Sequence, residues 1–254
     1  MRKAPILASL FGLCIACAPT DLSALAAASE TCRAITVEDY PAKKVRITTH
    51  TDFTRSHYPA RIAEFIQNPL GCGEIVMLGD SLTERHDWTG SLDVPHIIRN
   101  RGISGDTSDG VLVRLKEIIA SRPNAVFVLI GTNDLWSNNT AKTTAMNVEK
   151  IILTLRANNP QLPIFLQTVF PLRSDPARNE KVQSINVRLV DLARTNSVTI
   201  VDTYSLMVDE RGLLKSLYTD DGVHLTPAGY KAWVSLLNDK VREAQSIGSS
   251  AKVP

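Results

Sequence analysis

The chain has 254 residues, a net charge of +2, 44% hydrophobic residues and 21% charged residues. These values are typical of a globular protein, and the length suits one sizeable core better than two. No stretch concentrates Lys and Arg with interleaved aromatic residues, so the sequence lacks the electrostatic footprint of a nucleic-acid-binding protein. We therefore expect one globular domain without a nucleic-acid partner.

The N-terminus is typical of a secretory signal peptide. Met1–Lys3 is basic, residues 4–18 are apolar, and Ala24–Ala26 supplies the small residues of a cleavage site. The apolar run is shorter than the roughly 20 residues that span a bilayer, so we expect residues 1–26 to be cleaved and no integral membrane span to remain. The protein would then be exported to the bacterial periplasm or secreted. Lipid attachment at Cys17 is an alternative, although the Leu usually found three positions earlier is absent.

Cleavage after residue 26 leaves two cysteines, Cys32 and Cys72. An even pair in an exported protein predicts a disulfide, and the alternative is two free buried thiols. Residues 27–56 show mixed polarity without a sustained period and are expected to form an N-terminal arm. A globular domain is expected over residues 57–245, followed by a C-terminal tail, residues 246–254.

Strand-like and helical segments alternate along the expected domain. The spacing of Ile62, Phe65 and Ile66 predicts a helix from Pro59 that Asn68–Gly71 ends. Continuously apolar runs are typical of strands that are buried on both faces of a parallel sheet. There are four such runs: Glu74–Leu78, Ala125–Ile130, Pro163–Leu166 and Val198–Val201.

Helical patterns separate these runs. Three of them are marked by apolar residues on one face: Val111, Leu115, Ile118 and Ile119; Val148, Ile151, Ile152 and Leu155; and Val182, Ile185, Leu189 and Leu192. A last helix is predicted with Thr226 as N-cap, Pro227 as first residue and an apolar stripe over Tyr230–Val241. With a weaker strand over Pro95–Ile103, the alternation predicts an α/β sandwich with a parallel sheet of about five strands.

Three polar or small residues follow the ends of the first three predicted strands. Ser81 stands past the first strand, Gly105 past the second and Asn133 past the third. Because ligands bind outside the carboxyl ends of strands in such a sheet, we expect these residues on one rim. Each also has a simpler interpretation: Ser81 as a helix N-cap, and Gly105 and Asn133 as turn residues. Asp80 and Asp134 are expected to be structural turn and cap residues.

A serine nucleophile needs a base, and the C-terminal part of the chain supplies a candidate. Asp221 lies three positions before His224, close enough to bond the imidazole and fix its tautomer. Asp220 could take that place in principle. The remaining histidines are expected at surface or packing positions: His50, His57, His86 and His96.

The chain resembles the SGNH hydrolases, also called the GDSL esterase and lipase family, in four segments that occur in the family's order. These segments are Gly79–Leu82, Ser104–Thr107, Gly131–Asp134 and Asp221–Pro227. Their flanking residues, 101–107 and 224–230, resemble most the branch of platelet-activating-factor acetylhydrolase catalytic subunits and bacterial acetyl esterases. The resemblance implies a flavodoxin-like, three-layer α/β/α sandwich.

The resemblance also implies a mechanism. Ser81, His224 and Asp221 would form the catalytic triad, with Asp221 preferred to Asp220. The backbone N–H groups of Ser81 and Gly105 and the side-chain amide of Asn133 would form the oxyanion hole. The reaction would be hydrolysis of short acyl esters, above all acetyl esters, through an acyl-enzyme.

The substrate is expected to be a small-molecule or saccharide ester. The alternatives are an O-acetyltransferase acting on saccharides and a lysophospholipase or thioesterase of the same family, whereas the intact motifs argue against a non-catalytic carbohydrate-binding module. The sequence contains no Gly-x-Ser-x-Gly elbow, nucleotide-binding glycine loop or His-Glu-x-x-His metal motif, so no cofactor or metal ion is implied. Arg173 and Arg178 would be solvated loop charges or, alternatively, contacts for an acidic saccharide.

Overall fold

The structure is a computed structural model that describes residues 32–157 and 159–250. The expected signal peptide, residues 1–26, and the alternative lipid attachment at Cys17 lie outside the described residues. All elements below belong to one compact unit, Thr31–Pro254. In the described part of the chain, no helix is both long and apolar enough to cross a membrane.

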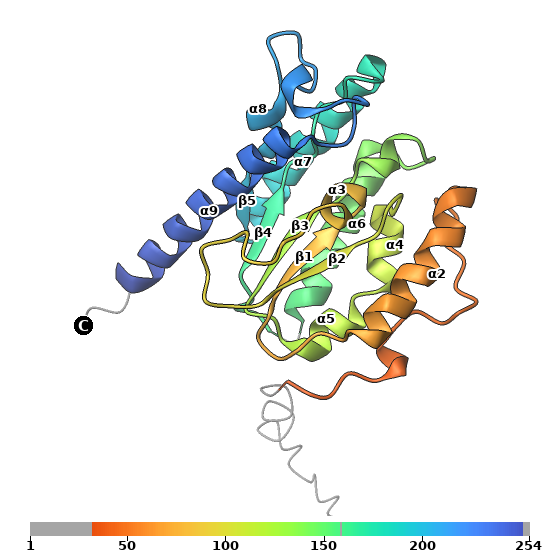
Figure 1. The fold of residues 1–254 in the computed structure, drawn as a ribbon, viewed down its shortest axis with the longest axis vertical. Coiled ribbons are helices and arrows are strands. Elements are labelled where there is room, and N and C mark those ends of the chain that lie inside the picture. The colour runs from red at the N-terminus through yellow and green to blue at the C-terminus, as the bar shows by residue number, and fades with distance from the viewer. Residues whose placement is uncertain (1–31, 158, 251–254) are drawn as a thin grey trace, which may run out of the picture. The chain divides into compact units, whose positions relative to one another are not determined.

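Five parallel strands form the centre of the molecule (Figure 1). They are β1 (Ile75–Gly79), β2 (Ile98–Gly102), β3 (Ala125–Leu129), β4 (Ile164–Gln167) and β5 (Thr199–Val201). Their spatial order is β2-β1-β3-β4-β5, and every neighbouring pair is parallel. This is the flavodoxin-like order, in which the direction of winding reverses between β1 and β3. The predicted fold class is confirmed.

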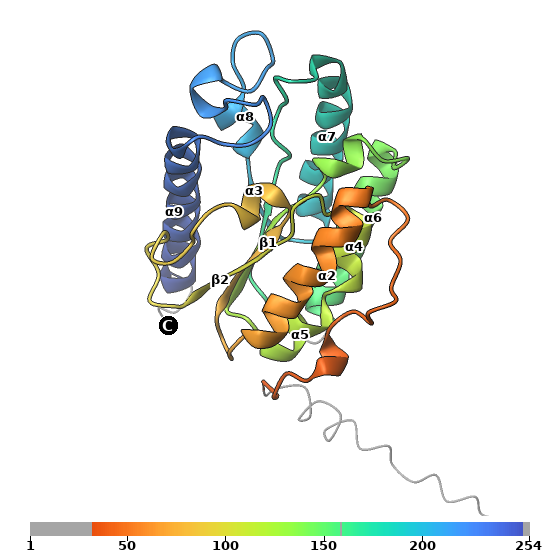
Figure 2. The ribbon, with the colours of Figure 1, turned by 45° about the vertical axis from the view of Figure 1, so that its right-hand side comes forward.

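Helices cover both faces of the sheet, as Figures 1 and 2 show. The α-helices are α2 (Asp52–Gln67), α3 (Ser81–Glu84), α4 (Ser108–Val113), α5 (Lys116–Ser121), α6 (Ala141–Arg156), α7 (Asn179–Thr195), α8 (Thr203–Met207) and α9 (Pro227–Ser250). Short 3-10 turns occur at η1 (Val37–Asp39), η2 (Asn133–Leu135), η3 (Pro176–Arg178) and η4 (Ser216–Tyr218). Helix α9 therefore continues into the range expected as a C-terminal tail.

Alternating strand residues divide the core into two apolar layers. On β1, Val76 and Leu78 pack with residues of α4, α5, α6 and α7. Ile75 and Met77 point to the other face and pack with α8 and α9. Because side chains alternate across a strand, β1 needs apolar residues at every position to fill both layers. This explains the uninterrupted apolar runs in the sequence.

Helix α2 starts earlier than predicted. The hydroxyl of Thr51 accepts the backbone N–H of Thr54 (3.2 Å) and caps the helix, so it begins at Asp52 and not at Pro59. Ile66 is exposed, contrary to the predicted apolar face. The buried face instead carries Thr54, Tyr58, Ile62 and Phe65. Two of these four residues carry hydroxyl groups, so the start of the helix gives little apolar periodicity.

The single helix predicted around Val111–Ile119 is two helices, α4 and α5. Thr107 caps α4 by accepting the N–H of Gly110 (3.4 Å). Arg114 ends α4, and its guanidinium is buried, where it pairs with Asp106. The apolar residues keep a helical spacing across the break between α4 and α5, because both short helices pack on the same face of the sheet.

The predicted disulfide between Cys32 and Cys72 is confirmed, with the two Cα atoms 5.7 Å apart. Cys72 lies just before β1, so the bridge ties the N-terminal segment to the start of the sheet. A separate apolar cluster continues this attachment: Tyr40, Ile47, Tyr58, Ile62, Phe65 and Ile103. Residues 32–67 are therefore packed onto the β2 side of the domain.

Candidate active site

Ser81 lies where β1 ends and the short helix α3 begins. The Asp80 carboxylate accepts the backbone N–H of Leu82 (3.0 Å), so Asp80 caps this helix. Ser81 is its first residue, at the carboxyl end of the sheet. The interpretation of Ser81 as the N-cap is wrong, whereas the structural role expected for Asp80 is confirmed.

Ser81, His224 and Asp221 form a continuous chain of polar contacts. Oγ of Ser81 lies 3.0 Å from Nε2 of His224. Nδ1 of His224 lies 2.6 Å from Oδ2 of Asp221. The other carboxylate oxygen of Asp221 accepts the backbone N–H groups of His224 (2.7 Å) and Val223 (2.9 Å). The carboxylate next to the imidazole is therefore Asp221 and not Asp220.

The surroundings of Asp221 keep its carboxylate ionised. Partial burial raises the pKa of Asp221, but hydrogen bonds from the His224 ring and from two backbone N–H groups together outweigh it. The net result is a pKa well below the ordinary value. Asp220 is exposed and has no hydrogen bond or ion pair in the described part of the chain.

Gly105 lies in the loop after β2, at a position where a side chain does not fit. Its φ is +80°, in the left-handed region that favours glycine. A Cβ atom there would lie 2.1 Å from Oγ of Thr54. The Thr54 hydroxyl donates to the carbonyl of Gly105 (3.3 Å), so α2 holds this loop at close range. The backbone N–H of Gly105 has no acceptor among residues 32–157 and 159–250.

Asn133 begins η2, and three residues separate it from the end of β3. Its Nδ2 donates to the backbone carbonyl of Asp106 (2.9 Å) and lies 3.4 Å from Oδ2 of Asp80. An amide nitrogen carries two hydrogens, and here one is donated to Asp106 and the other, over the longer distance, to Asp80. The longer bond to Asp80 is the one that Asn133 would exchange for a new acceptor in the cavity. The bond to Asp106 ties the loop after β3 to the loop that carries Gly105.

One cavity brings these side chains together. Ser81, Gly105, Asn133 and His224 all line a space of about 290 Å³ at the carboxyl end of the sheet. Asp221 bonds His224 from behind. A larger cavity of about 630 Å³ lies between residues 37–47 and α2. Ser81, Gly105, Asn133 and His224 do not line this larger cavity. The chemistry of the side chains therefore points to the smaller cavity as the site.

Part of the cavity wall comes from residues that the sequence analysis did not single out. The segment before α2 and the start of this helix supply Thr49, Thr51, Phe53 and Thr54. Arg85 and Trp136 line other parts of the wall. None of these residues belongs to a recognisable motif, and residues 49–54 carry no apolar period, so only the three-dimensional arrangement reveals them.

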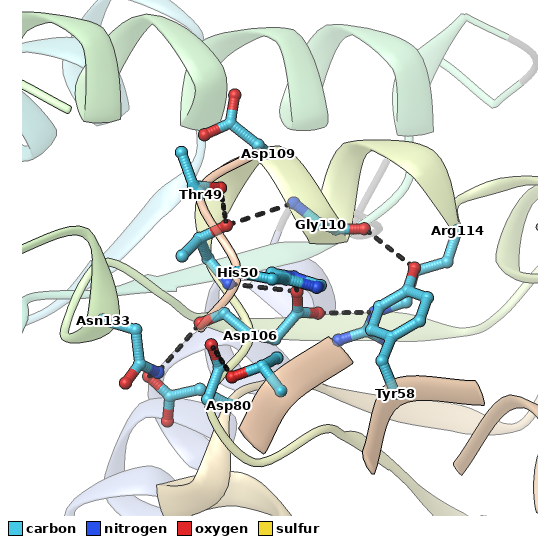
Figure 3. A network of polar contacts seen from close by, with 12 residues as sticks. Thr49, His50, Tyr58, Asp80, Asp106, Asp109, Gly110, Arg114 and Asn133 are labelled. Atoms are coloured by element: carbon cyan, nitrogen blue, oxygen red, sulfur yellow. Dashed lines mark hydrogen bonds and ion pairs between the residues drawn. The ribbon is translucent and has the colours of Figure 1, made fainter. Parts of the chain in front are cut away.

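A buried polar network surrounds Asp106, the residue after Gly105 (Figure 3). The Asp106 carboxylate accepts Nε of Arg114 (2.9 Å) and lies 2.9 Å from Nε2 of His50. Arg114 also donates to the backbone carbonyls of Arg101 (2.7 Å) and Gly79 (2.9 Å), at the ends of β2 and β1. His50 is thus a packing residue, as expected, and its partner is a carboxylate of the site's own loop.

The two arginines expected in the loop after β4 are both paired with carboxylates. Arg173 pairs with Asp209, and Arg178 pairs with Asp175 (2.7 Å) and lies over the ring of Trp136. Neither arginine lines the cavity around Ser81. Both are therefore partly exposed loop charges, as expected, but each is held by a carboxylate. Within the described residues, no group of three or more His, Cys, Asp or Glu side chains could hold a metal ion.

Comparison with known proteins found a matching family and related sequences. The model of the GDSL-like Lipase/Acylhydrolase family matches residues 77–232. Platelet-activating factor acetylhydrolase IB subunit alpha2 from Homo sapiens is 29% identical over 164 residues, which cover 62% of this chain and 71% of that protein.

Solved structures of related proteins have a similar fold. A GDSL-like lipase from Bacteroides thetaiotaomicron superposes with a TM-score of 0.57 at 26% identity, covering 75% of this chain and 98% of the other. An acetyl-xylooligosaccharide esterase from Geobacillus Stearmophilus has a TM-score of 0.54 at 20% identity, covering 66% and 94%. At this lower identity the second likeness concerns the fold alone.

Proposed function

Because this chain belongs to the GDSL-like lipase/acylhydrolase family and is a carboxylic ester hydrolase, we propose that it is an exported serine esterase that cleaves short acyl esters, above all acetyl esters. Ser81 is the nucleophile, His224 the base and Asp221 the residue that orients the base. The observation that carries this proposal is the unbroken chain from Ser81 through His224 to Asp221, which opens on a cavity.

The distances support nucleophilic catalysis. Nε2 of His224, 3.0 Å from Oγ of Ser81, can take the hydroxyl proton while Oγ attacks the ester carbonyl carbon. The imidazolium then gives this proton to the leaving alcohol, and an acyl-enzyme remains. Water, deprotonated by the same nitrogen, releases the acid and restores Ser81. Asp221 stays ionised and stabilises the imidazolium.

The cavity also offers donors for the negative charge that develops on the carbonyl oxygen. Candidates are the N–H groups of Ser81 and Gly105 and the Nδ2 of Asn133, all of which belong to residues that line it. The N–H of Ser81 belongs to the first residue of α3, and the Gly105 backbone is held by the hydrogen bond from Thr54. These two backbone groups therefore need not reorganise during the reaction. This fixed arrangement favours the transition state over the ground state.

The size of the cavity supports a short acyl group. A volume of about 290 Å³ lies at the lower end of the range for small-molecule sites. The Thr54 side chain and the Gly105 backbone, which lie in direct contact, form part of its wall. The name of the human relative, an acetylhydrolase, supports the same class.

Export is supported by two features of the chain. The basic, apolar and small residues of residues 1–26 follow the order of a signal peptide. The Cys32–Cys72 disulfide suits an oxidising compartment, because structural disulfides are rare in the bacterial cytosol.

Covalent labelling tests the nucleophile. A fluorophosphonate should add once to the protein, as seen by intact mass, and the adduct should be absent in Ser81→Ala. Ser137→Ala is a matched control, because Ser137 also lines the cavity but does not contact His224. It should still be labelled. Labelling of Ser81→Ala would assign the nucleophile elsewhere.

A chain-length series tests the acyl group. With nitrophenyl esters, kcat/KM should be highest between acetate and butyrate, since longer chains exceed the cavity. A maximum at octanoate or beyond would make the enzyme a lipase or thioesterase of the same family.

A further inference from the structure

Arg85 projects from the same face of the chain as the proposed nucleophile. Its backbone N–H donates to the carbonyl of Ser81 (3.0 Å), so Ser81 and Arg85 are separated by one turn of helix. Residues four apart on a helix lie one above the other, with their Cβ atoms roughly 5–6 Å apart. The side chain of Arg85 therefore leaves the backbone close to Ser81, and it is exposed.

Arg85 is shared between two cavities. It lines the cavity around Ser81 and also a second cavity of about 510 Å³, which we call the α9 groove. The other walls of the α9 groove come from the loop after α3 and from the beginning of α9, including Leu225, Tyr230, Lys231 and Val234. Because Leu225 directly follows His224, the groove begins where the catalytic cavity ends.

The floor of the α9 groove is apolar and uncharged. The ring of His86 is stacked on the ring of Tyr230, with centroids 4.6 Å apart, and Tyr230 is buried. Burial lowers the pKa of His86, so this ring is neutral around pH 7. The side chains of Leu225 and Val234 pack against the same cluster as Tyr230.

The charges at the edge of the groove are of one sign. Arg85 and Lys231 are exposed, and in the described part of the chain neither forms an ion pair. No Asp or Glu lines either cavity. By contrast, Arg173 and Arg178 pair with carboxylates. A cleft lined by one sign of charge concentrates ligands of the opposite sign.

We propose that the α9 groove binds the alcohol part of the substrate, and that this alcohol carries an anionic group, a carboxylate or a phosphate, held by Arg85 and Lys231. A guanidinium matches the planar fork of a carboxylate or phosphate, and a lysine adds a second positive charge. The proposal rests on the proposed esterase function, because the groove is an alcohol site only if the ester is attacked by Ser81.

Pairs of acetate esters that differ in one charged group test this subsite. One pair is an O-acetylated methyl glucuronoside and its neutral methyl ester; the other is acetylglycerol phosphate and monoacetylglycerol. For wild type, kcat/KM should be about tenfold or more higher for an anionic member than for its neutral partner, the size expected of a charge-assisted contact. This ratio should fall as salt is added.

Variants then assign the preference to the two cations. In Arg85→Gln the anionic-to-neutral ratio should fall about tenfold, and in Lys231→Gln it should fall by a smaller factor. Arg188→Gln and Lys142→Gln are matched controls, since both residues are exposed and line neither cavity. Both controls should keep the wild-type ratio.

The outcomes separate the two proposals. A preference confined to the glucuronoside pair identifies an acidic saccharide, and one confined to the glycerol pair identifies a phosphate-bearing alcohol; either supports the subsite. Hydrolysis of nitrophenyl acetate with equal rates within both pairs overturns the subsite and leaves the esterase intact. A folded wild type that is inactive on all of these esters overturns both.

Discussion

Asp220 and Asp221 are neighbours in the chain, and only Asp221 reaches His224. We expect Asp221→Asn to lower kcat by about 10³- to 10⁴-fold, because an amide can neither hold the required tautomer nor stabilise the imidazolium. Asp220→Asn is the matched control and should retain nearly full turnover, since the exposed Asp220 has no polar partner in the described residues. Initial rates with nitrophenyl acetate measure both. The reverse pattern would exchange the two roles.

Asp80 predicts a pH dependence of stability. Complete burial is the main reason that its pKa rises from 3.8 to about 7, against the hydrogen bond from the N–H of Leu82. The folded state therefore holds a proton that the unfolded state has lost between about pH 4 and pH 7. Stability contributed by Asp80 is present below this window and is lost as the pH rises through it.

Asp80→Asn should remove this loss, because the amide stays neutral while its oxygen can still accept the Leu82 N–H. Denaturant unfolding between about pH 4.5 and 8 should give a free energy of unfolding that falls less steeply with pH in the variant than in wild type. Parallel curves for the two proteins would show that Asp80 is ionised throughout.

At this scale the sequence predicted which residues meet at the cavity but not their surroundings. Ser81 and Asn133 could be found because each follows a recognisable strand, and Gly105 because it stands in a motif after the weaker one. His50 and Thr54 could not, since their partners, Asp106 and Gly105, lie more than fifty positions away in the chain.

The elements that position the site differ in how readily the sequence predicts them. The strands β1 and β3 are continuously apolar and were found nearly to the residue. β2 carries Arg99 and Arg101, whose charges are paired with Glu74 and Glu117. The sequence alone does not reveal that these charges are paired, because the partners are distant in the chain, so β2 was predicted only as a weak strand. The start of α2 escaped prediction because half of its buried face is hydroxylic.

Arg114 joins α4 to three other segments, and its removal should destabilise the whole sheet edge. In Arg114→Leu the Asp106 carboxylate loses a buried ion pair, and the carbonyls of Arg101 and Gly79 lose a donor. Breaking a buried ion pair from one side costs about 3–5 kcal/mol. Urea titration should show this decrease in the free energy of unfolding.

An exposed arginine provides the comparison. Arg188→Leu on α7 removes the same charge from the surface and should change the free energy of unfolding by about 0.5 kcal/mol or less. Equal effects of the two substitutions would mean that the network around Asp106 contributes nothing beyond a surface charge.

For the whole molecule, the cavity around Ser81 extends beyond the region that the family model matches. Residues 77–232 contain Ser81, Gly105, Asn133 and His224. Other wall residues, at positions 49–54, come from before that region, and they reach the cavity because the N-terminal segment is attached to the domain. The attachment consists of the apolar packing around Tyr40, the contact of His50 with Asp106 and the disulfide at Cys32.

The disulfide should stabilise the fold as a whole. It links residues 40 positions apart, and closing such a loop restricts the unfolded chain, which contributes about 2–4 kcal/mol. The double variant Cys32→Ser/Cys72→Ser should lose this amount in denaturant unfolding, and reduction of the wild type should lower its midpoint to the same value. Reductant should leave the double variant unchanged, which controls for other effects of the reagent. Because Thr49–Thr54 are also held by His50 and by the apolar cluster, the variant should still cleave nitrophenyl acetate at temperatures well below its midpoint. If the oxidised wild type and the double variant unfold at the same denaturant concentration, the apolar cluster and the Asp106 network alone hold the N-terminal segment in place.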